Sequence, residues 1–150
     1  MKNLIVRRAR HAEVPVLMDM QTKIFSEEQG IPAALVREVT GRDPHFWVAV
    51  LDGRVVGGAA SWTEENGVHL GRFVVTPPLR ARHIGRRILR CAFDELFADG
   101  AERVHMEARD VTVRLVCAMG GEVVGEPVPF FIGDVTPVLL EKSAYRPLSD

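Results

Sequence analysis

A strand, loop and helix near the middle of the chain carry the residues whose types and spacing point most clearly to chemistry. Residues 70–89 read as a buried strand, a turn marked by Pro77 and Pro78, an arginine-rich loop and an amphipathic helix. A loop that enters a helix in this way directs unpaired backbone N–H groups and the positive end of the helix dipole at one place. Guanidinium groups bind phosphate through paired donors. Five arginines lie here within eleven residues: Arg80, Arg82, Arg86, Arg87 and Arg90. The stretch therefore predicts a phosphate-binding site.

The elements that position this loop follow from hydrophobic spacing and turn signals. Helices are expected at 11–25, 32–40, 83–98 and 110–119, and strands at 4–8, 46–51, 54–62, 68–75, 104–108, 122–131 and 136–142. Asp52-Gly53 predicts a two-residue hairpin turn, and Asp110 is expected to cap the last helix. The order β-α-α-β-β-β-α-β-α-β-β, without linker or repeat, describes one mixed α/β domain over residues 1–150.

Composition is that of an ordinary globular protein. The 150 residues are 47% hydrophobic and 26% charged, with a formal net charge of −1. These values argue against disorder and against a global field for nucleic acid or an anionic membrane. No apolar run approaches the roughly 20 residues that span a bilayer. The N-terminus has no signal-type apolar region, and Cys91 and Cys117 read as reduced thiols. We therefore expect a cytoplasmic protein.

Arg80, His83 and Gly85 have the spacing of a known cofactor loop. Arg80-x-x-His83-x-Gly85 resembles the Gln/Arg-x-x-Gly-x-Gly/Ala signature of the GCN5-related N-acetyltransferase superfamily. The element order is also that of the superfamily, and residues 25–32 look like the Glu-Gln-Gly-Ile-Pro segment of small bacterial members. The resemblance implies the acyl-CoA N-acyltransferase fold, with a mixed, mostly antiparallel central sheet. It also implies an N-acetyltransferase that uses acetyl-CoA and releases coenzyme A.

The resemblance assigns a set of cofactor contacts. The strand is expected to offer backbone groups to the pantetheine arm, the loop to offer N–H groups to the pyrophosphate, and Arg82 or Arg87 to add charge toward the 3′-phosphate. The residues so assigned are Phe73, Val74, Val75, Arg80, Ala81, Arg82, His83, Ile84, Gly85 and Arg86. The alternative is a helix whose arginines are merely solvated.

His83 departs from the superfamily pattern, since it stands where the first glycine is usual. A glycine there permits positive φ and a close approach of the backbone. We expect ordinary helical dihedral angles at His83, with the side chain pointing outward and binding retained. If the position instead requires positive φ, affinity should fall or the loop must change shape.

The main candidates for general base or for anchoring the acceptor are His69, Glu28 and Glu107, and Glu27 stands beside Glu28 as a further one. His69 falls where several superfamily members carry a catalytic glutamate, and histidine titrates near neutrality. Its alternative interpretation is an inert strand-end residue. Glu28 lies in the segment after the first helix, where glutamates are most often solvated, and Glu107 interrupts an apolar strand. For Glu107 a structural ion pair with Arg109 or Arg72 is expected.

The general acid of the superfamily has no obvious counterpart. Many members place a tyrosine beside the thioester sulfur, whereas Val116 occupies that position here. Either water protonates the leaving thiolate, or Cys117 or Tyr145 approaches, or catalysis is weak. Four aromatic residues could line an acceptor pocket: Trp47, Trp62, Phe130 and Phe131. Because aromatic residues on strands are more often part of the core, only Phe131, near Gly133, is expected at a pocket rim.

These observations predict transfer of an acetyl group by direct attack of a small-molecule or peptide amine. The reaction is expected in the cleft where strands 68–75 and 104–108 splay apart. The main alternative is a non-catalytic acyl-CoA-binding or regulatory module, consistent with the missing tyrosine. Near-neutral charge and the lack of interleaved aromatic residues disfavour nucleic-acid binding. No metal site and no membrane association are predicted, and a homodimer is left open.

Overall fold

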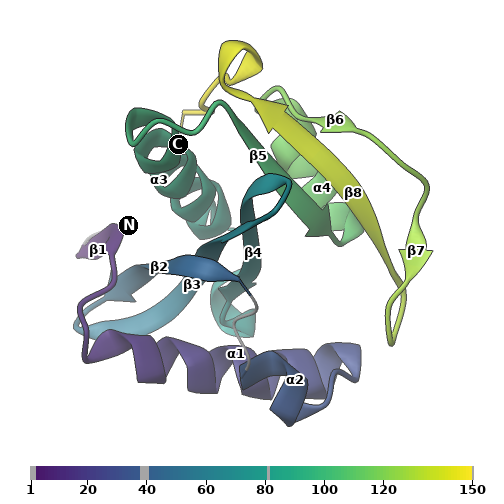
Figure 1. Cartoon of the computed structure of the whole chain (residues 1–150). Helices are drawn as coiled ribbons and strands as arrows, with labels where there is room; N and C mark the ends of the chain where they lie inside the picture. The colour runs from purple at the N-terminus through teal and green to yellow at the C-terminus, as the bar shows by residue number, and fades with distance from the viewer. Residues whose placement is uncertain (1–2, 38–40, 81, 150) are drawn as a thin grey trace.

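The computed structural model describes residues 3–37, 41–80 and 82–149. Four antiparallel strands form the N-terminal half of its sheet (Figure 1): β1 (Leu4–Arg8), β2 (Arg42–Leu51), β3 (Arg54–Glu64) and β4 (Gly67–Val75). The turn between β2 and β3 places Asp52 at φ 49° and Gly53 at φ 82°. Two consecutive positive φ values match the right-handed twist of a hairpin. The predicted hairpin is confirmed.

The C-terminal half of the sheet is built around β8 (Asp134–Glu141). It pairs antiparallel with β5 (Arg103–Ala108) and with two short strands, β6 (Glu122–Val123) and β7 (Val128–Pro129). The single strand expected over 122–131 is therefore wrong. Gly125 and Pro127 separate the two short strands, and proline cannot donate to a strand ladder.

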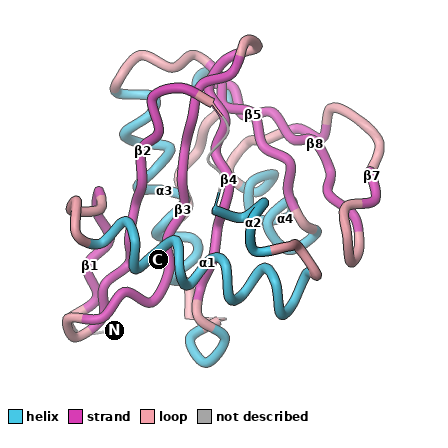
Figure 2. The backbone as a smooth tube through the Cα atoms, turned by 60° about the horizontal axis from the view of Figure 1, so that its bottom comes forward, coloured by secondary structure: helices cyan, strands magenta, loops and turns pink. Residues whose placement is uncertain are grey.

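The two halves meet where β4 lies parallel to β5, and this junction is short. Only Val68 pairs with Val104 and His69 with His105, after which the two strands diverge. Figure 2 shows β4 and β5 adjacent at one end and apart at the other. The resulting strand order is β1-β2-β3-β4-β5-β8-β6. The predicted mixed α/β fold is confirmed, and the splay opens beyond His69.

Helices cover both faces of the N-terminal half (Figure 1). On one face α1 (Glu13–Gln29) packs Leu17 and Ile24 against Val48 and Val50, and α2 (Ala33–Arg37) lies beside it. On the other face α3 (Ile84–Ala98) packs with Trp47. The helix α4 (Asp110–Ala118) packs against β8 and also contributes to this second core. Short 3-10 helices lie at Pro77–Leu79 and Lys142–Ala144. Alternate residues of β2 thus face different cores, as strand geometry requires.

Helix boundaries differ from the expected ones. The first helix continues through the expected break at Ser26 and ends where Gly30 adopts φ 69°. Asp110 is the first helical residue of α4 and not its cap, because Arg109 holds the extended N-cap conformation. The last residues of the expected helix at 32–40 lie outside the described residues. None of the described helices is both long enough and apolar enough to cross a membrane.

Candidate active site

A local distortion of β4 gives the splayed strands their shape. Gly58 pairs with Val74 but Ala60 pairs with Gly71, so β4 carries one more residue than β3 over this interval. Arg72, inside the bulge, has φ 54°, and its carbonyl oxygen accepts a 2.6 Å hydrogen bond from Gln21 Nε2. Gln21 is fully buried in α1. A bulge bends its strand, and here the first helix holds it in place.

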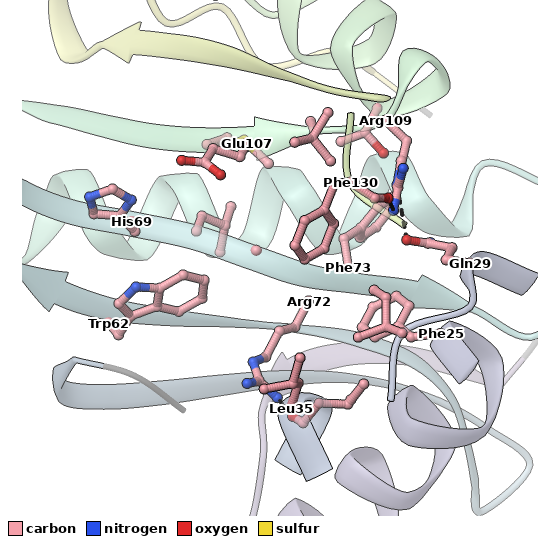
Figure 3. A pocket seen from close by; sticks show the side chains of 18 of the residues that line it. Phe25, Gln29, Leu35, Trp62, His69, Arg72, Phe73, Glu107, Arg109 and Phe130 are labelled. Atoms are coloured by element: carbon pink, nitrogen blue, oxygen red, sulfur yellow. Dashed lines mark hydrogen bonds between the residues drawn. The ribbon is translucent and has the colours of Figure 1, made fainter. Parts of the chain in front are cut away.

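A cavity of about 450 Å³ opens between the diverging strands (Figure 3). The α1–α2 side contributes Phe25, Gln29 and Leu35, and the β-strand walls contribute Trp62, His69 and Glu107. Phe130, from the segment between β7 and β8, also lines it. The volume is within the range of small-molecule sites. The cleft predicted between strands 68–75 and 104–108 therefore coincides with a cavity.

His69 lines this cavity in a stack of rings that crosses three strands. Its imidazole is stacked between Trp62, at 6.0 Å, and His105, at 5.0 Å between ring centroids. Nε2 lies 2.6 Å from Asn66 Oδ1 and Nδ1 lies 3.4 Å from Glu64 Oε2. Burial lowers the pKa of His69, and the nearby Glu64 carboxylate opposes this effect.

These contacts define which nitrogen of His69 is basic. If Nε2 donates its proton to Asn66, Nδ1 carries the lone pair of the neutral ring. Glu64 is then placed to stabilise the proton that Nδ1 accepts. The lowered pKa keeps the ring neutral at physiological pH. The arrangement suits a general base.

The two candidate glutamates lie in different environments. Glu107 lines the cavity, and within the described residues it forms no ion pair, so the expected pair with Arg109 or Arg72 is wrong. Glu28 does not line the cavity. Its two carboxylate oxygens accept hydrogen bonds of 2.9 and 3.0 Å from Arg80. The structure brings Glu107 and His69 together and places Glu28 elsewhere.

The two arginines that line the cavity are bonded to the protein itself. Arg109 donates to Gln29 Oε1 at 2.9 Å and to the carbonyl oxygens of Phe130, Ile132 and Asp134. Arg72 donates to the carbonyl oxygen of Val36. Arg109 thus holds the segment between β7 and β8 against α1. Because this places Phe130 at the cavity, Phe130 takes the position expected of Phe131, which does not line it.

No phenol or thiol reaches the cavity among the described residues. Val116 is fully buried, and Cys117 does not line the cavity. Tyr145 donates a 2.7 Å hydrogen bond to Asp94 Oδ1 and packs against Phe93 and Phe97. Burial raises the pKa of Tyr145. The alternative in which Cys117 or Tyr145 approaches the cavity as the general acid is therefore not seen in this structure.

The start of α3 offers free hydrogen-bond donors. Within the described residues, the backbone N–H groups of 82–86 donate no hydrogen bond, and the first helical donor is Arg87 N, 3.2 Å from His83 O. Such groups, with the helix dipole, bind anionic oxygen. Arg86 Nε is buried with no partner in the described part of the chain. The residues present therefore fit a diphosphate; Ala81 lies outside the described residues.

His83 does not have the helical dihedral angles expected of it. It adopts φ 61° and ψ 11°, the left-handed conformation, immediately before α3. The position thus has the backbone conformation that glycine favours. Histidine is one of the few other residues that adopt this conformation with some frequency. Since the side chain is exposed, the loop keeps a glycine-like path with the imidazole directed away from the core.

Gly85 and Arg80 position the loop through packing and hydrogen bonds. A Cβ atom on Gly85 would lie 2.6 Å from Cζ of Phe73, so the glycine lets α3 approach β4. Arg80 Nε donates to Val75 O at 3.0 Å while its two terminal nitrogens bind Glu28. The side chain of Arg80 therefore links the end of β4 to α1, and it is not free for phosphate as the motif suggested.

The remaining arginines of the cluster divide into two groups. Arg86 Nη1 donates to Ser149 O at 3.1 Å and Arg90 Nη1 to Leu148 O at 2.8 Å, which holds the C-terminal segment against α3. Arg82 is exposed and has no partner within the described residues. Arg87 has a partner. Arg82 is thus the arginine of the loop left to meet a phosphate.

Sequence reasoning did not find Arg109 and Gln29 as parts of the site, and it favoured a place in the core for Trp62, which lines the cavity. Trp62 pairs with His69 across β3 and β4, so the hairpin register was the signal that places it. The link from Arg109 to Gln29 spans 80 positions of the chain and has no local sequence signal.

Comparisons with solved structures show the same fold. A GCN5-related N-acetyltransferase from Kribbella flavida is 22% identical, with a TM-score of 0.73 over 93% of this chain and 98% of that one. Escherichia coli ElaA is 17% identical, with a TM-score of 0.79 over 94% and 100%. The ribosomal-protein-S18-alanine N-acetyltransferase of Escherichia coli is 15% identical, with a TM-score of 0.70 over 92% and 93%.

The family comparison adds sequence evidence to this fold. A search among curated proteins found no match. The model of the acetyltransferase (GNAT) family matches residues 14–120, which run from α1 through α4 and include the β4–α3 loop and most of the cavity walls. The chain is therefore an enzyme that belongs to the GNAT family of N-acetyltransferases.

Proposed function

We propose that this protein transfers the acetyl group of acetyl-CoA to a primary amine by direct attack. The observation that supports the proposal is one continuous path. Free N–H groups at 82–86 begin it, the edge of β4 that is unpaired beyond His69 continues it, and the cavity with His69 and Glu107 ends it. Each part has the chemistry that one part of the thioester requires.

Acetyl-CoA, when bound, supplies an activated acetyl thioester that an amine attacks with release of coenzyme A. The N–H groups of 82–86 would hold the pyrophosphate, and the exposed Arg82 would approach the 3′-phosphate. Phe73, Val74 and Val75 would offer backbone groups to the pantetheine arm along the open edge of β4. The family membership and the fit of these groups support this assignment.

His69 would remove the proton from the attacking nitrogen through Nδ1. Burial lowers its pKa, so the ring is neutral and ready to accept a proton near pH 7. Glu107 would attract the ammonium form of the acceptor into the cavity. Because no phenol lines the cavity within the described residues, water would protonate the leaving thiolate.

The proposal treats residues 1–150 as one domain that acts in the cytoplasm. The acceptor is a small-molecule or peptide amine. The net charge of −1 gives no general attraction for nucleic acid or anionic membranes. A homodimer stays an open prediction.

The missing phenol favours a second candidate function, an acyl-CoA-binding module without turnover. Thiol release from acetyl-CoA over a panel of amines separates the two functions. Release above the rate of hydrolysis supports the enzyme. Binding of acetyl-CoA without release from any amine supports the module.

Calorimetry with acetyl-CoA tests the site itself. Arg82→Ala should weaken binding several-fold at low salt, and less at high salt, because one phosphate contact is lost. Arg54→Ala, an exposed arginine at the β2–β3 turn, is the matched control and should bind as the parent does. A folded protein that shows no heat with millimolar acetyl-CoA would contradict the proposal.

A further inference from the structure

The cavity contains an acidic end that is open to a ligand. Glu107 lines it and, within the described residues, has no hydrogen bond or ion pair. Glu64, on the adjacent part of the wall, accepts a 2.8 Å hydrogen bond from Trp62 Nε1 and lies near His69. In Figure 3 the Glu107 carboxylate, His69 and Trp62 gather at the same end of the cavity. Carboxylates and an indole ring together attract a cation.

The positive groups of the cavity are bound to protein oxygen atoms. Arg109 uses its Nε and both terminal nitrogens on four oxygen acceptors from Gln29 and from residues 130–134. Arg72 is bound to Val36 O and has a further interaction. A ligand carboxylate would have to displace these bonds. Glu107, in contrast, has no hydrogen bond or ion pair within the described residues that a ligand ammonium would have to break. Of these charged groups, the one available to a ligand is therefore a carboxylate, which binds a cation.

Away from the acidic end, apolar side chains line the cavity beside Gln29, Thr112 and the two bonded arginines. Phe25, Leu35, Met106, Phe130 and Val135 line it, with contributions from α1, α2, β5 and the segment around β7 and β8. Leu35 is 53% exposed and Phe130 is 42% exposed. In Figure 3 the labelled Leu35, Phe25 and Phe130 lie away from the end that carries Glu107 and His69. Covering such surfaces with an apolar group of a ligand is energetically favourable.

We propose that the acceptor is a small amine whose ammonium group is attached to an apolar body without a carboxylate, such as an arylalkylamine. Glu107 and Trp62 receive the ammonium group, and the apolar side chains receive the body. This inference rests on the proposed function, because it takes the cavity to be the acceptor site of an acetyltransferase.

Direct binding tests the ligand class without requiring turnover. Calorimetry compares phenethylamine with phenylalanine, which adds only a carboxylate, and with ethylamine, which lacks the ring. Phenethylamine should bind at least about tenfold more tightly than either, because phenylalanine brings an unpartnered carboxylate beside Glu107 and ethylamine leaves the apolar wall uncovered. Equal binding of the three amines, or tighter binding of phenylalanine, would overturn the inference.

A matched pair of variants links the result to the acidic end. Glu107→Gln should weaken phenethylamine binding by about tenfold, the size of one charge-assisted contact. Glu102→Gln, an exposed glutamate just before β5 that does not line the cavity, is the control and should leave binding unchanged. If Glu107→Gln binds as tightly as the parent, Glu107 is not the ammonium receptor and the inference fails.

Acetyl transfer to the same amines separates this inference from the proposed function. Phenethylamine that binds but is not acetylated, with acetyl-CoA present, supports the ligand class and contradicts the proposed transfer. Faster acetylation of phenylalanine than of phenethylamine supports the transfer and overturns the ligand class.

Discussion

At the scale of single residues, the chemistry depends on the surroundings of His69. The ring is held between Trp62 and His105, and burial there lowers its pKa below the ordinary value of 6.5. A lowered pKa keeps the base uncharged at pH values where an ordinary histidine begins to be protonated. The loss of activity in acid should therefore occur at a lower pH than for an unperturbed histidine.

His69→Gln should reduce kcat by about 10²–10⁴-fold, the usual contribution of a general base. The parent enzyme, measured at saturating acceptor, should lose kcat only as the pH falls below 6.5, and this acid limb should be missing from the variant. The measurement is kcat against pH from 5 to 8. His11→Gln, at an exposed position, is the control. An unchanged acid limb in His69→Gln would assign the base to another group.

His83 carries a left-handed backbone at the start of α3, which costs a residue with a Cβ roughly 1 kcal/mol. His83→Gly removes this strain, but it also adds a similar amount of entropy to the unfolded chain. We expect the free energy of unfolding to change by less than about 1 kcal/mol, and affinity for acetyl-CoA to be retained. Urea unfolding and calorimetry measure the two. A tenfold loss of affinity would show that the imidazole itself binds the cofactor.

The sequence allowed His69 to be located, because counting back along the strand before the loop needs only a correct strand assignment. It did not allow Glu28 to be placed, because its partner Arg80 lies 52 positions away. The dihedral angles of His83 were also missed, because hydrophobic spacing marks where a helix starts but not the φ of the residue before it.

At the scale of elements, the contact between α3 and β4 sets the geometry of the loop. Phe73 lies in the β4 bulge and its ring fills the space that Gly85 leaves open. Alanine normally has a higher helix propensity than glycine. Here the added methyl group would meet the ring at 2.6 Å.

Gly85→Ala should therefore lower the free energy of unfolding by about 1–3 kcal/mol, as overpacking does, and weaken acetyl-CoA binding by moving α3. Adding Phe73→Leu should restore much of both. Urea unfolding and calorimetry on the single and double variants test this. A single variant that is more stable than the parent would show that helix propensity outweighs the contact.

Most elements could be predicted, because each has its own periodicity and turn residues. The bulge at Arg72 could not, since it exists only relative to the register of β3 and the support of Gln21. The expected strand over 122–131 failed for a local reason that the sequence does contain. Pro127 and Gly125 interrupt it, and neither residue favours the interior of a strand.

At the scale of the whole molecule, Cys91 reports on global stability. Burial, with a 3.3 Å hydrogen bond to Glu95, raises the pKa of its thiol to about 12. Since the thiolate is the reactive form, Cys91 should react with alkylating reagents at pH 7.5 far more slowly in the folded protein than in the unfolded chain.

Peptide-level mass spectrometry across a urea series measures this reaction. Alkylation of Cys91 should rise together with the loss of circular dichroism, and the fully unfolded chain gives the reference rate. Rapid alkylation of Cys91 in native buffer would show that α3 opens locally toward β1, whose Val6 carbonyl oxygen lies 3.9 Å from the thiol.

The short junction of the two half-sheets has a mechanical consequence. Since β4 and β5 share only two residue pairs, much of their separation depends on contacts made behind the sheet. The segment after β8 makes two such contacts. Tyr145 donates a hydrogen bond to Asp94 of α3, and the Arg146 N–H donates to Met119 O at 2.8 Å. An extended molecule can therefore lie between the two strands as an additional strand without breaking any hydrogen bond between β4 and β5. We therefore expect such a molecule to bind without partial unfolding of the sheet.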